Sequence, residues 1–217
     1  MAETQAMVQA KLVKAGKTDS MNCAQIFAQF DPPIEMGTHE EMQGTQKGYQ
    51  AEHILPCSAM HESGRSGPKF GECGDYRTSA ALTWMASDGQ SAGQEHKLLT
   101  DPMREFSQKN ALAGRNATRD EWMDEYEKAT KKALRNGEKR RKLKDPSLDR
   151  DSLIDKAAKC IRILAEQSFD EIGITAKTKL RNSWDPTKEQ AAAHKAAEAA
   201  KQAAAKAAKK AASGKLA

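Results

Sequence analysis

The sequence predicts an α+β fold that is predominantly α-helical, and two patterns carry this prediction. The first is a pair of amphipathic segments, residues 118–136 and 153–169, in which apolar side chains recur every three or four positions. The second is a pair of short apolar runs, residues 49–56 and 79–85, separated by a Gly-rich stretch. The run at 49–56 is typical of a strand, whereas the run at 79–85 fits a strand or a short helix.

Length and composition describe a polar chain with room for one sizeable domain. The 217 residues suffice for one domain plus an appendage, or for two small domains. The charged fraction is 30% and the mean hydropathy is −0.78. No apolar run approaches the ~20 residues that span a bilayer, and no basic-then-apolar segment opens the chain. We therefore expect no membrane-spanning segment and no classical signal peptide.

The positive charge of the chain is concentrated in its tail. Between residues 184 and 217, seven lysines against three acidic residues account for +4 of the net charge of +5. This stretch is rich in Ala and Lys, which favour helix but supply no side chains for a core. We expect a solvated helix or a disordered arm here. The rest of the chain is nearly neutral, so composition alone does not establish a nucleic-acid partner.

The four cysteines show no CxxC pair and no zinc-finger spacing. We expect reduced and mostly buried thiols, as in a cytosolic protein. A bridge between Cys57 and Cys73, or a loose structural metal site, is the alternative.

We expect three parts: an N-terminal helical segment at 1–44, the main domain at 45–183 and the tail at 184–217. Within the first part, apolar residues at 23, 26, 27 and 30 predict a short helix that ends at Asp31-Pro32-Pro33, because the residue before a proline avoids the helical region. Residues 37–48 are polar and indicate a loop.

Three further helix signals follow the apolar runs. Ser91 with Gln94 forms a capping-box pattern that places His96 within the first two turns of a helix. Pro102 predicts a kink or a restart of this helix near Asp101.

Residues 118–121 form a second capping-box pattern, and Asn136-Gly137 closes that helix. The third helix, which begins before residue 153, should end near Ser168 or Phe169. The basic run at 139–144 is either a solvated linker or a phosphate-contacting patch, and the sequence favours neither.

Chemistry is suggested by Glu52-His53, an adjacent acid and histidine in the run at 49–56. Such neighbours point to opposite faces of a strand, but at a twisted strand end both reach one cleft. There, one side chain can hold a cation while the other takes a proton from water. Alternatively, Glu52 faces solvent and His53 is a satisfied, half-buried histidine. His96, 43 residues after His53 at a predicted helix start, supplies a second ligand and favours the chemical interpretation.

This order of elements, an acid-His strand, a long loop, a second apolar run and a helix bearing a His, resembles the HNH and endonuclease VII superfamily of ββα-metal nucleases. The motifs at 51–56, 79–81 and 91–96 are similar to those of C-terminal nuclease toxin domains in bacterial polymorphic toxin systems. The resemblance covers roughly residues 45–110 and implies a small ββα-metal site module embedded in a helical body.

The resemblance also implies roles for individual residues. His53 would be the general base that activates water, and Glu52 and His96 would be metal ligands. The third member of the site is unassigned, because residues 92 and 100 are Ala and Thr. Candidates for it, in order, are Asp88, Glu95, Gln94 and His61. Mg²⁺ suits the carboxylate, while the imidazole also admits Mn²⁺, Ni²⁺ or Zn²⁺.

From this resemblance we expect a metal-dependent, largely sequence-nonspecific DNA endonuclease that acts as an antibacterial toxin domain. RNA is the alternative substrate, since such a site does not read the 2′-hydroxyl. A cognate immunity protein would cover the site, and a specialised secretion system would deliver the domain to the target-cell cytoplasm. The competing hypothesis is a non-enzymatic helical interaction module with a nucleic-acid-binding tail. The expected phosphate contacts are Arg65, Lys69, Lys139, Arg140 and Arg141.

Overall fold

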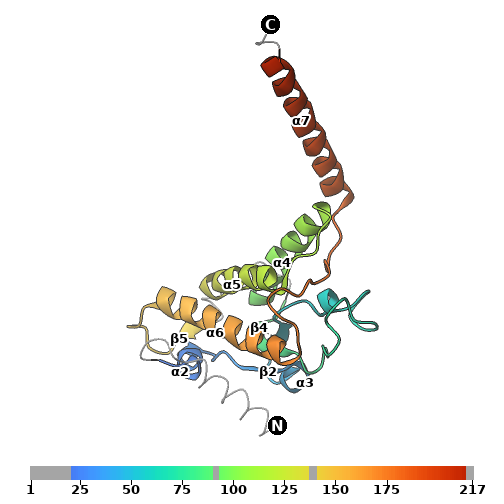
Figure 1. Cartoon of the computed structure of the whole chain (residues 1–217). Coiled ribbons are helices and arrows are strands. Elements are labelled where there is room, and N and C mark those ends of the chain that lie inside the picture. Colours follow the sequence, from blue (N-terminus) through green and yellow to red (C-terminus); the bar gives the residue numbers. More distant parts are fainter. Residues whose placement is uncertain (1–20, 90–92, 137–140, 214–217) are drawn as a thin grey trace.

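The structure is a computed structural model that describes residues 21–89, 93–136 and 141–213, with side chains described up to residue 208. It is an α+β fold, about half helical, with two small antiparallel sheets (Figure 1). The α+β class predicted from the sequence is confirmed. Lys139 and Arg140, expected to contact phosphate, and Ser91, expected to cap a helix, lie outside the described residues.

The larger sheet has three strands in the order β2-β4-β3. They are β2 (Met36–Thr38), β3 (Tyr49–His53) and β4 (Leu82–Ser87), and each neighbouring pair is antiparallel. The run at 79–85, which fitted either a strand or a short helix, therefore leads into the central strand. In that strand Trp84 and its neighbours are buried, because helices cover the sheet.

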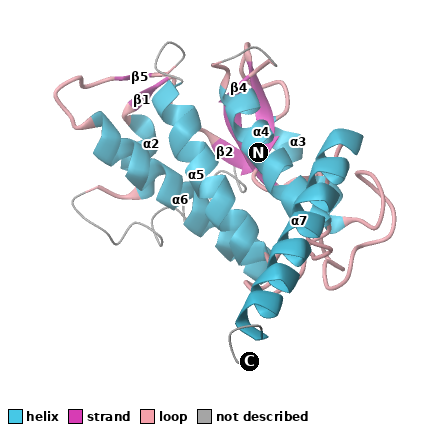
Figure 2. Ribbon diagram, turned by 90° about the horizontal axis from the view of Figure 1, so that it is seen from above, coloured by secondary structure: helices cyan, strands magenta, loops and turns pink. Residues whose placement is uncertain are grey.

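Three long helices follow β4: α4 (Glu95–Leu112), α5 (Arg119–Asn136) and α6 (Arg150–Glu171). Helix α5 packs against both α4 and α6, and Figure 2 shows α5 and α6 side by side. The predicted capping box of α5 is confirmed: the Thr118 amide donates to the Glu121 carboxylate at 2.8 Å, and the Glu121 amide donates to the Thr118 hydroxyl at 3.2 Å. Helix α6 ends slightly later than the sequence predicted.

Short elements complete the N-terminal half. The first helix ends earlier than predicted, because Phe30 joins strand β1 and pairs with Leu143. The predicted loop at 37–48 is also wrong in part, since it contains the end of β2 and a one-turn helix. These elements are α2 (Cys23–Ala28), β1 (Phe30–Asp31), α3 (His39–Met42), the 3-10 helix η1 (Cys57–Met60) and β5 (Lys142–Leu143).

Of the kink or restart predicted near Asp101, the restart is wrong, because α4 continues through Pro102 as one helix. A proline in a helix interior lacks the amide that would bond to the fourth preceding carbonyl, at a cost of about 3 kcal/mol. The neighbouring side chains Leu99 and Met103 are buried in the core. Burial of each such side chain contributes about 1.5–3 kcal/mol, which offsets the proline.

The tail forms a single long helix, α7 (Lys188–Ser213), which projects away from the rest of the molecule (Figure 1). Its lysines at 188, 195, 201 and 206 are exposed. Of the two states expected for the tail, the structure has the solvated helix. Among the described residues, no helix is long and apolar enough to cross a membrane.

The cysteine expectation is wrong for two of the four thiols. Cys23 in α2 and Cys160 in α6 form a disulfide, and their Cα atoms lie 5.7 Å apart. Cys57 and Cys73, the pair considered as a bridge, are free and buried. The bridge joins residues separated by 137 positions, so the spacing of the cysteines carried no signal for it.

We predict that replacing both Cys23 and Cys160 by serine lowers the free energy of unfolding by about 3 kcal/mol, since a bridge that closes a long loop restricts the unfolded chain. Denaturant unfolding of the oxidised protein and the variant measures this difference. A reductant should destabilise the wild type but leave the variant unchanged. Four titratable thiols in the unreduced, denatured protein would contradict the disulfide.

Candidate functional site

A cavity of about 240 Å³ lies where the end of β3 meets the start of α4. Apolar side chains, including Met103 and Trp184, form part of its wall. Its acidic, basic and histidine lining residues are Glu52, His53, Arg65, His96 and Arg104. The structure therefore brings three predicted catalytic residues and one predicted phosphate contact to a single cavity.

Glu52 and His96 are in direct contact within this cavity. The Glu52 carboxylate lies 2.5 Å from His96 Nδ1, and the two side chains are 12% and 20% exposed. The hydrogen bond to Glu52 raises the pKa of His96, and burial raises the pKa of Glu52. Both shifts are expected when a buried acid and an imidazole share one proton.

His53, the last residue of β3, lines the same cavity as Glu52. Its Nε2 lies 3.3 Å from the Thr78 carbonyl, which can only accept, so Nε2 carries the proton and Nδ1 is left as an acceptor. Burial, together with the nearby His39, lowers the pKa of His53 to about 4. His53 is therefore neutral at physiological pH and able to take a proton.

The ring of His39, the first residue of α3, lies against His53 with centroids 4.1 Å apart. Burial and the charge of Arg65 lower the pKa of His39, so the pair is uncharged near neutral pH. This ring contact holds His53 in addition to the bond to the Thr78 carbonyl. His39 thus restricts the orientation of the imidazole at the cavity.

Arg65 is a cation whose charge acts on Glu52, His53 and His96 alike. It lies in the Gly-rich loop, is exposed, and its charge lowers the pKa of Glu52, His53 and His96. An exposed guanidinium at a cavity lined by an acid and imidazoles is suited to bind an anion, because it presents a fork of donors to two oxygens at once.

The start of α4 is fixed by a buried ion pair between Glu95 and Arg141, both fully buried. Arg141 Nε donates to Glu95 Oε1 at 3.1 Å, and Nη2 donates to Oε2 at 3.2 Å. Its other three N–H groups donate to the carbonyls of Pro32, Pro33 and Met85 at 2.7–2.8 Å. All five donors of the guanidinium are therefore satisfied within the protein.

Both members of this ion pair had been predicted as site residues, and both predictions are wrong. Glu95, a candidate third member of the site, points toward Arg141 and Ser87 instead of the cavity, since successive helical side chains diverge and His96 takes the cavity side. Arg141, expected to contact phosphate, is buried and fully hydrogen-bonded. Its guanidinium also lies over the rings of Tyr49 and Trp84, at 5.1 and 5.8 Å from their centroids.

The remaining predictions fall outside the cavity lining. Lys69, expected to contact phosphate, donates instead to Nε2 of buried His61 at 2.8 Å. Nδ1 of His61 lies 2.8 Å from the Cys57 carbonyl, so this histidine holds a loop. Asp88 is exposed at the end of β4, and its charge raises the pKa of His96.

The sequence interpretation missed Arg104, although a signal for it was present. His96, Thr100 and Arg104 recur every four residues, and this spacing places them on one face of α4. Trp184, which was not predicted as a site residue, also lines the cavity. The Thr78 carbonyl, which orients His53, has no signature in the sequence because any residue supplies a carbonyl.

The donor set at the cavity fits a divalent cation held by two protein ligands. Among the described residues, no three His, Cys, Asp or Glu side chains are gathered around one point. Glu52 and His96 present a carboxylate and an imidazole, which together suit Mg²⁺, Mn²⁺ or Zn²⁺. Their mutual hydrogen bond uses atoms that would bind the cation, and water or substrate oxygens would fill the other positions.

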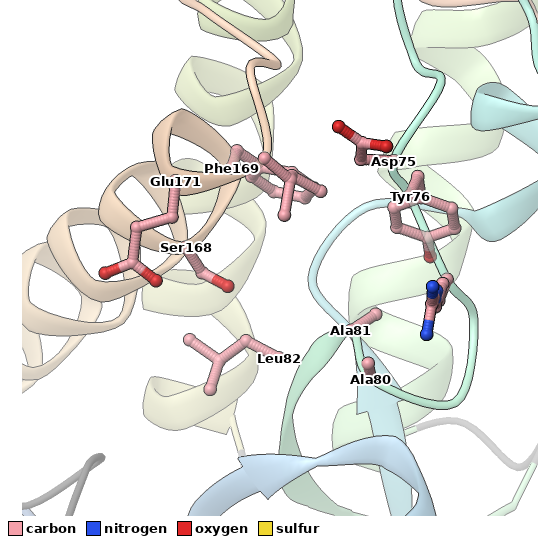
Figure 3. Close-up of a pocket in the computed structure, with 10 residues that line it drawn as sticks. Asp75, Tyr76, Ala80, Ala81, Leu82, Ser168, Phe169 and Glu171 are labelled. Atoms are coloured by element: carbon pink, nitrogen blue, oxygen red, sulfur yellow. The ribbon is translucent and has the colours of Figure 1, made fainter.

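A second, larger cavity of about 420 Å³ lies between the loop before β4 and the end of α6. Figure 3 shows Phe169 of α6 on one side and Asp75 and Tyr76 of the loop on the other. None of the histidines in the described part of the chain lines it. The larger cavity also has charged lining residues, Asp75, Arg77 and Glu171, but only the smaller of the two combines an acid with histidines, so we take the smaller one as the candidate site.

Comparison of the chain with protein-family models, with curated proteins and with solved structures gave no match. The interpretation of the site therefore depends on its own geometry and chemistry.

We predict that Arg141→Met lowers the free energy of unfolding by about 3–5 kcal/mol, because it leaves the Glu95 carboxylate buried without its partner. Denaturant unfolding measures the loss. Adding Glu95→Gln to the variant should recover part of it, whereas Arg135→Gln, at an exposed ion pair of α5, should change stability little. If Arg141→Met is as stable as the wild type and binds nucleic acid more weakly, Arg141 instead has a surface role.

We predict distinct titrations for the histidines of the metal-free protein, measured by NMR from their ring protons. The pKa of His53 should lie at about 4, and that of His96 should lie above its usual value. Glu52→Gln should lower the pKa of His96, because the carboxylate that stabilises the imidazolium is removed. Titration of His53 and His96 together near the usual value would contradict the described contacts.

Proposed function

We propose that the protein is a metal-dependent DNA endonuclease of the ββα-metal type that hydrolyses phosphodiester bonds with little sequence preference. The observation that carries the proposal is the meeting of Glu52, His53 and His96 at one cavity beside Arg65. The order of elements supports it, since β3 and β4 pair antiparallel and α4 follows directly with His96 near its start. We propose that β3, β4 and α4 correspond to the two strands and the helix of the nuclease superfamily that the sequence resembles.

The protein groups divide the reaction between them. Glu52 and His96 would hold the cation, which when bound neutralises charge on the scissile phosphate and its leaving oxygen. His53 takes a proton from the attacking water at Nδ1, while its Nε2–H remains donated to Thr78. Arg65 and Arg104 pair with phosphate oxygens. These groups address the sugar-phosphate backbone, so the reaction does not depend on sequence.

The biological role follows from the same resemblance. We propose that the domain is an antibacterial toxin, delivered by a specialised secretion system and active in the target-cell cytoplasm. A cognate immunity protein with an acidic face would mimic phosphate at Arg65 and Arg104 and cover the cavity.

A second candidate function is supported by α7. Its exposed lysines project away from the body and give a polyanion-binding arm that needs no catalysis. In that case the chain is a helical interaction module, and its binding of nucleic acid depends on the tail and on salt, without cleavage.

We predict that the purified chain nicks supercoiled plasmid when Mg²⁺ or Mn²⁺ is present and not when the cation is chelated. His53→Ala should slow nicking by about 10²- to 10⁴-fold, because general-base catalysis is lost. Glu52→Gln and His96→Ala should reduce both nicking and the affinity for Mn²⁺, which calorimetry measures separately. His53→Ala should retain its affinity for Mn²⁺.

The control is His194→Ala, whose histidine lies in α7 outside the cavity and should leave nicking unchanged. Deletion of residues 186–217 separates the two candidate functions. Metal-dependent nicking by the truncated chain supports the nuclease, whereas loss of all DNA binding without any nicking by the intact chain supports the interaction module.

A further inference from the structure

Trp184 and Arg104 form one side of the candidate site. Both line the cavity that holds Glu52 and His96, and the Arg104 guanidinium lies 5.9 Å from the centre of the Trp184 ring. An aromatic ring and a guanidinium are the two side-chain planes on which nucleobases stack. Their place beside the catalytic group puts a stacking surface next to the phosphate that would be cut.

The position of Trp184 is fixed by α4, the helix that carries His96. The Ser107 hydroxyl accepts from the Trp184 amide at 3.0 Å and lies 3.3 Å from the Trp184 carbonyl. The Gln108 side chain donates to the Asp185 carbonyl at 3.0 Å. These bonds hold the backbone of Trp184 on both sides, so its ring has a defined place relative to His96.

Trp184 also differs from the other tryptophans in its exposure. Of the three tryptophans, all within the part of the chain that the structure describes, Trp84 and Trp122 are fully buried, whereas Trp184 is half-buried. Trp184 therefore retains solvent-accessible surface, and it lines the cavity. Such surface is costly for a purely structural tryptophan and useful for a stacking one.

Arg104 is held in its present position only weakly. Its guanidinium is near the ~6 Å limit of a cation–π contact, and its ion pair with Asp101 is 3.6 Å long between side chains that are 44% and 38% exposed. Exposed ion pairs of this kind contribute little to holding a side chain in place. Arg104 can therefore turn to a phosphate and leave the Trp184 ring to a base.

We propose that Trp184 and Arg104 form a nucleotide subsite in which Trp184 stacks on an unpaired base and Arg104 binds the phosphate attached to it. The preferred substrate is then single-stranded or locally unpaired DNA. This proposal rests on the proposed nuclease function and names its substrate class. In a duplex both faces of each base are covered by neighbouring base pairs, so stacking on Trp184 requires an unpaired nucleotide.

The size of the cavity agrees with this assignment. At about 240 Å³ it is smaller than the ~300–1,000 Å³ of sites that enclose a whole small-molecule ligand. A cavity of this size takes a short piece of a polymer, with the rest of the strand outside. Stacking is also indifferent to the identity of the base, in keeping with cleavage that does not depend on sequence.

The test measures binding without cleavage. The full chain in EDTA is titrated with a labelled single-stranded oligonucleotide and with the duplex of the same sequence, at one fixed salt concentration. Anisotropy gives the affinities and tryptophan fluorescence reports stacking. We expect tighter binding of the single strand, with quenching of tryptophan emission that Trp184→Phe abolishes. Trp184→Leu should weaken single-strand binding by about 5- to 150-fold, the equivalent of ~1–3 kcal/mol per stacked base.

Matched variants separate stacking from folding and from charge. Trp184→Phe keeps an aromatic face and should keep most of the single-strand preference, so a loss seen only with Trp184→Leu is due to stacking. Near-ultraviolet circular dichroism of each variant shows whether the core is intact. Arg104→Gln should weaken binding and reduce its salt dependence by about one phosphate contact. Lys128→Gln, at a lysine 72% exposed on α5, should change neither.

The outcomes distinguish this proposal from the proposed function. Equal affinity for single strand and duplex, with no effect of Trp184→Leu, overturns the subsite even if the wild type still nicks plasmid. Trp184-dependent binding of single strands supports the subsite even if no metal produces cleavage, and in that case the nuclease assignment fails. Absence of DNA binding by the intact chain overturns both.

Discussion

The buried guanidinium of Arg141 is the interaction on which the arrangement of the site depends. Its five N–H groups bind the Glu95 carboxylate and the carbonyls of Pro32, Pro33 and Met85. One side chain thereby joins the segment after β1, the central strand β4 and the first turn of α4. A buried arginine is tolerated only when its charge is paired and every donor is satisfied, and both conditions are met here.

Glu95, which Arg141 holds, is followed directly by His96, so the same ion pair also positions His96. With Glu95 held against β4, the helical twist directs His96 to the other side of the turn, where it meets Glu52 at the end of β3. The pairing of β3 with β4 sets the positions of Glu52 and His53 along the sheet. The contact with the His39 ring and the bond to the Thr78 carbonyl orient the His53 ring. These contacts bring together side chains that lie far apart in the sequence.

Local patterns predicted much of this fold, and long-range pairing accounts for what they missed. Helices α5 and α6 were visible from apolar periodicity and from the Thr118 cap, because these signals lie within a few residues. The partners of Arg141 lie up to 109 positions away, and the Cys23–Cys160 bridge spans 137 positions. The basic run at 139–144 therefore indicated a surface patch, although Arg141 within it is fully buried and donates all five of its N–H groups to protein acceptors. Glu52, His53 and His96 were predicted as site residues from the order of strand, loop and helix. Arg104 could have been found only by asking which residues share the face of α4 that carries His96.

In the proposed nuclease, Glu52 and His96 would share one cation beside His53. The most direct measurement is anomalous diffraction from crystals of the protein soaked with Mn²⁺, compared with crystals of Glu52→Gln treated in the same way. We expect a single manganese peak within bonding distance of both Glu52 and His96 in the wild type, and no such peak in the variant. Wild-type crystals that retain the Glu52–His96 hydrogen bond, with no peak at the cavity or with manganese bound elsewhere, would contradict this expectation.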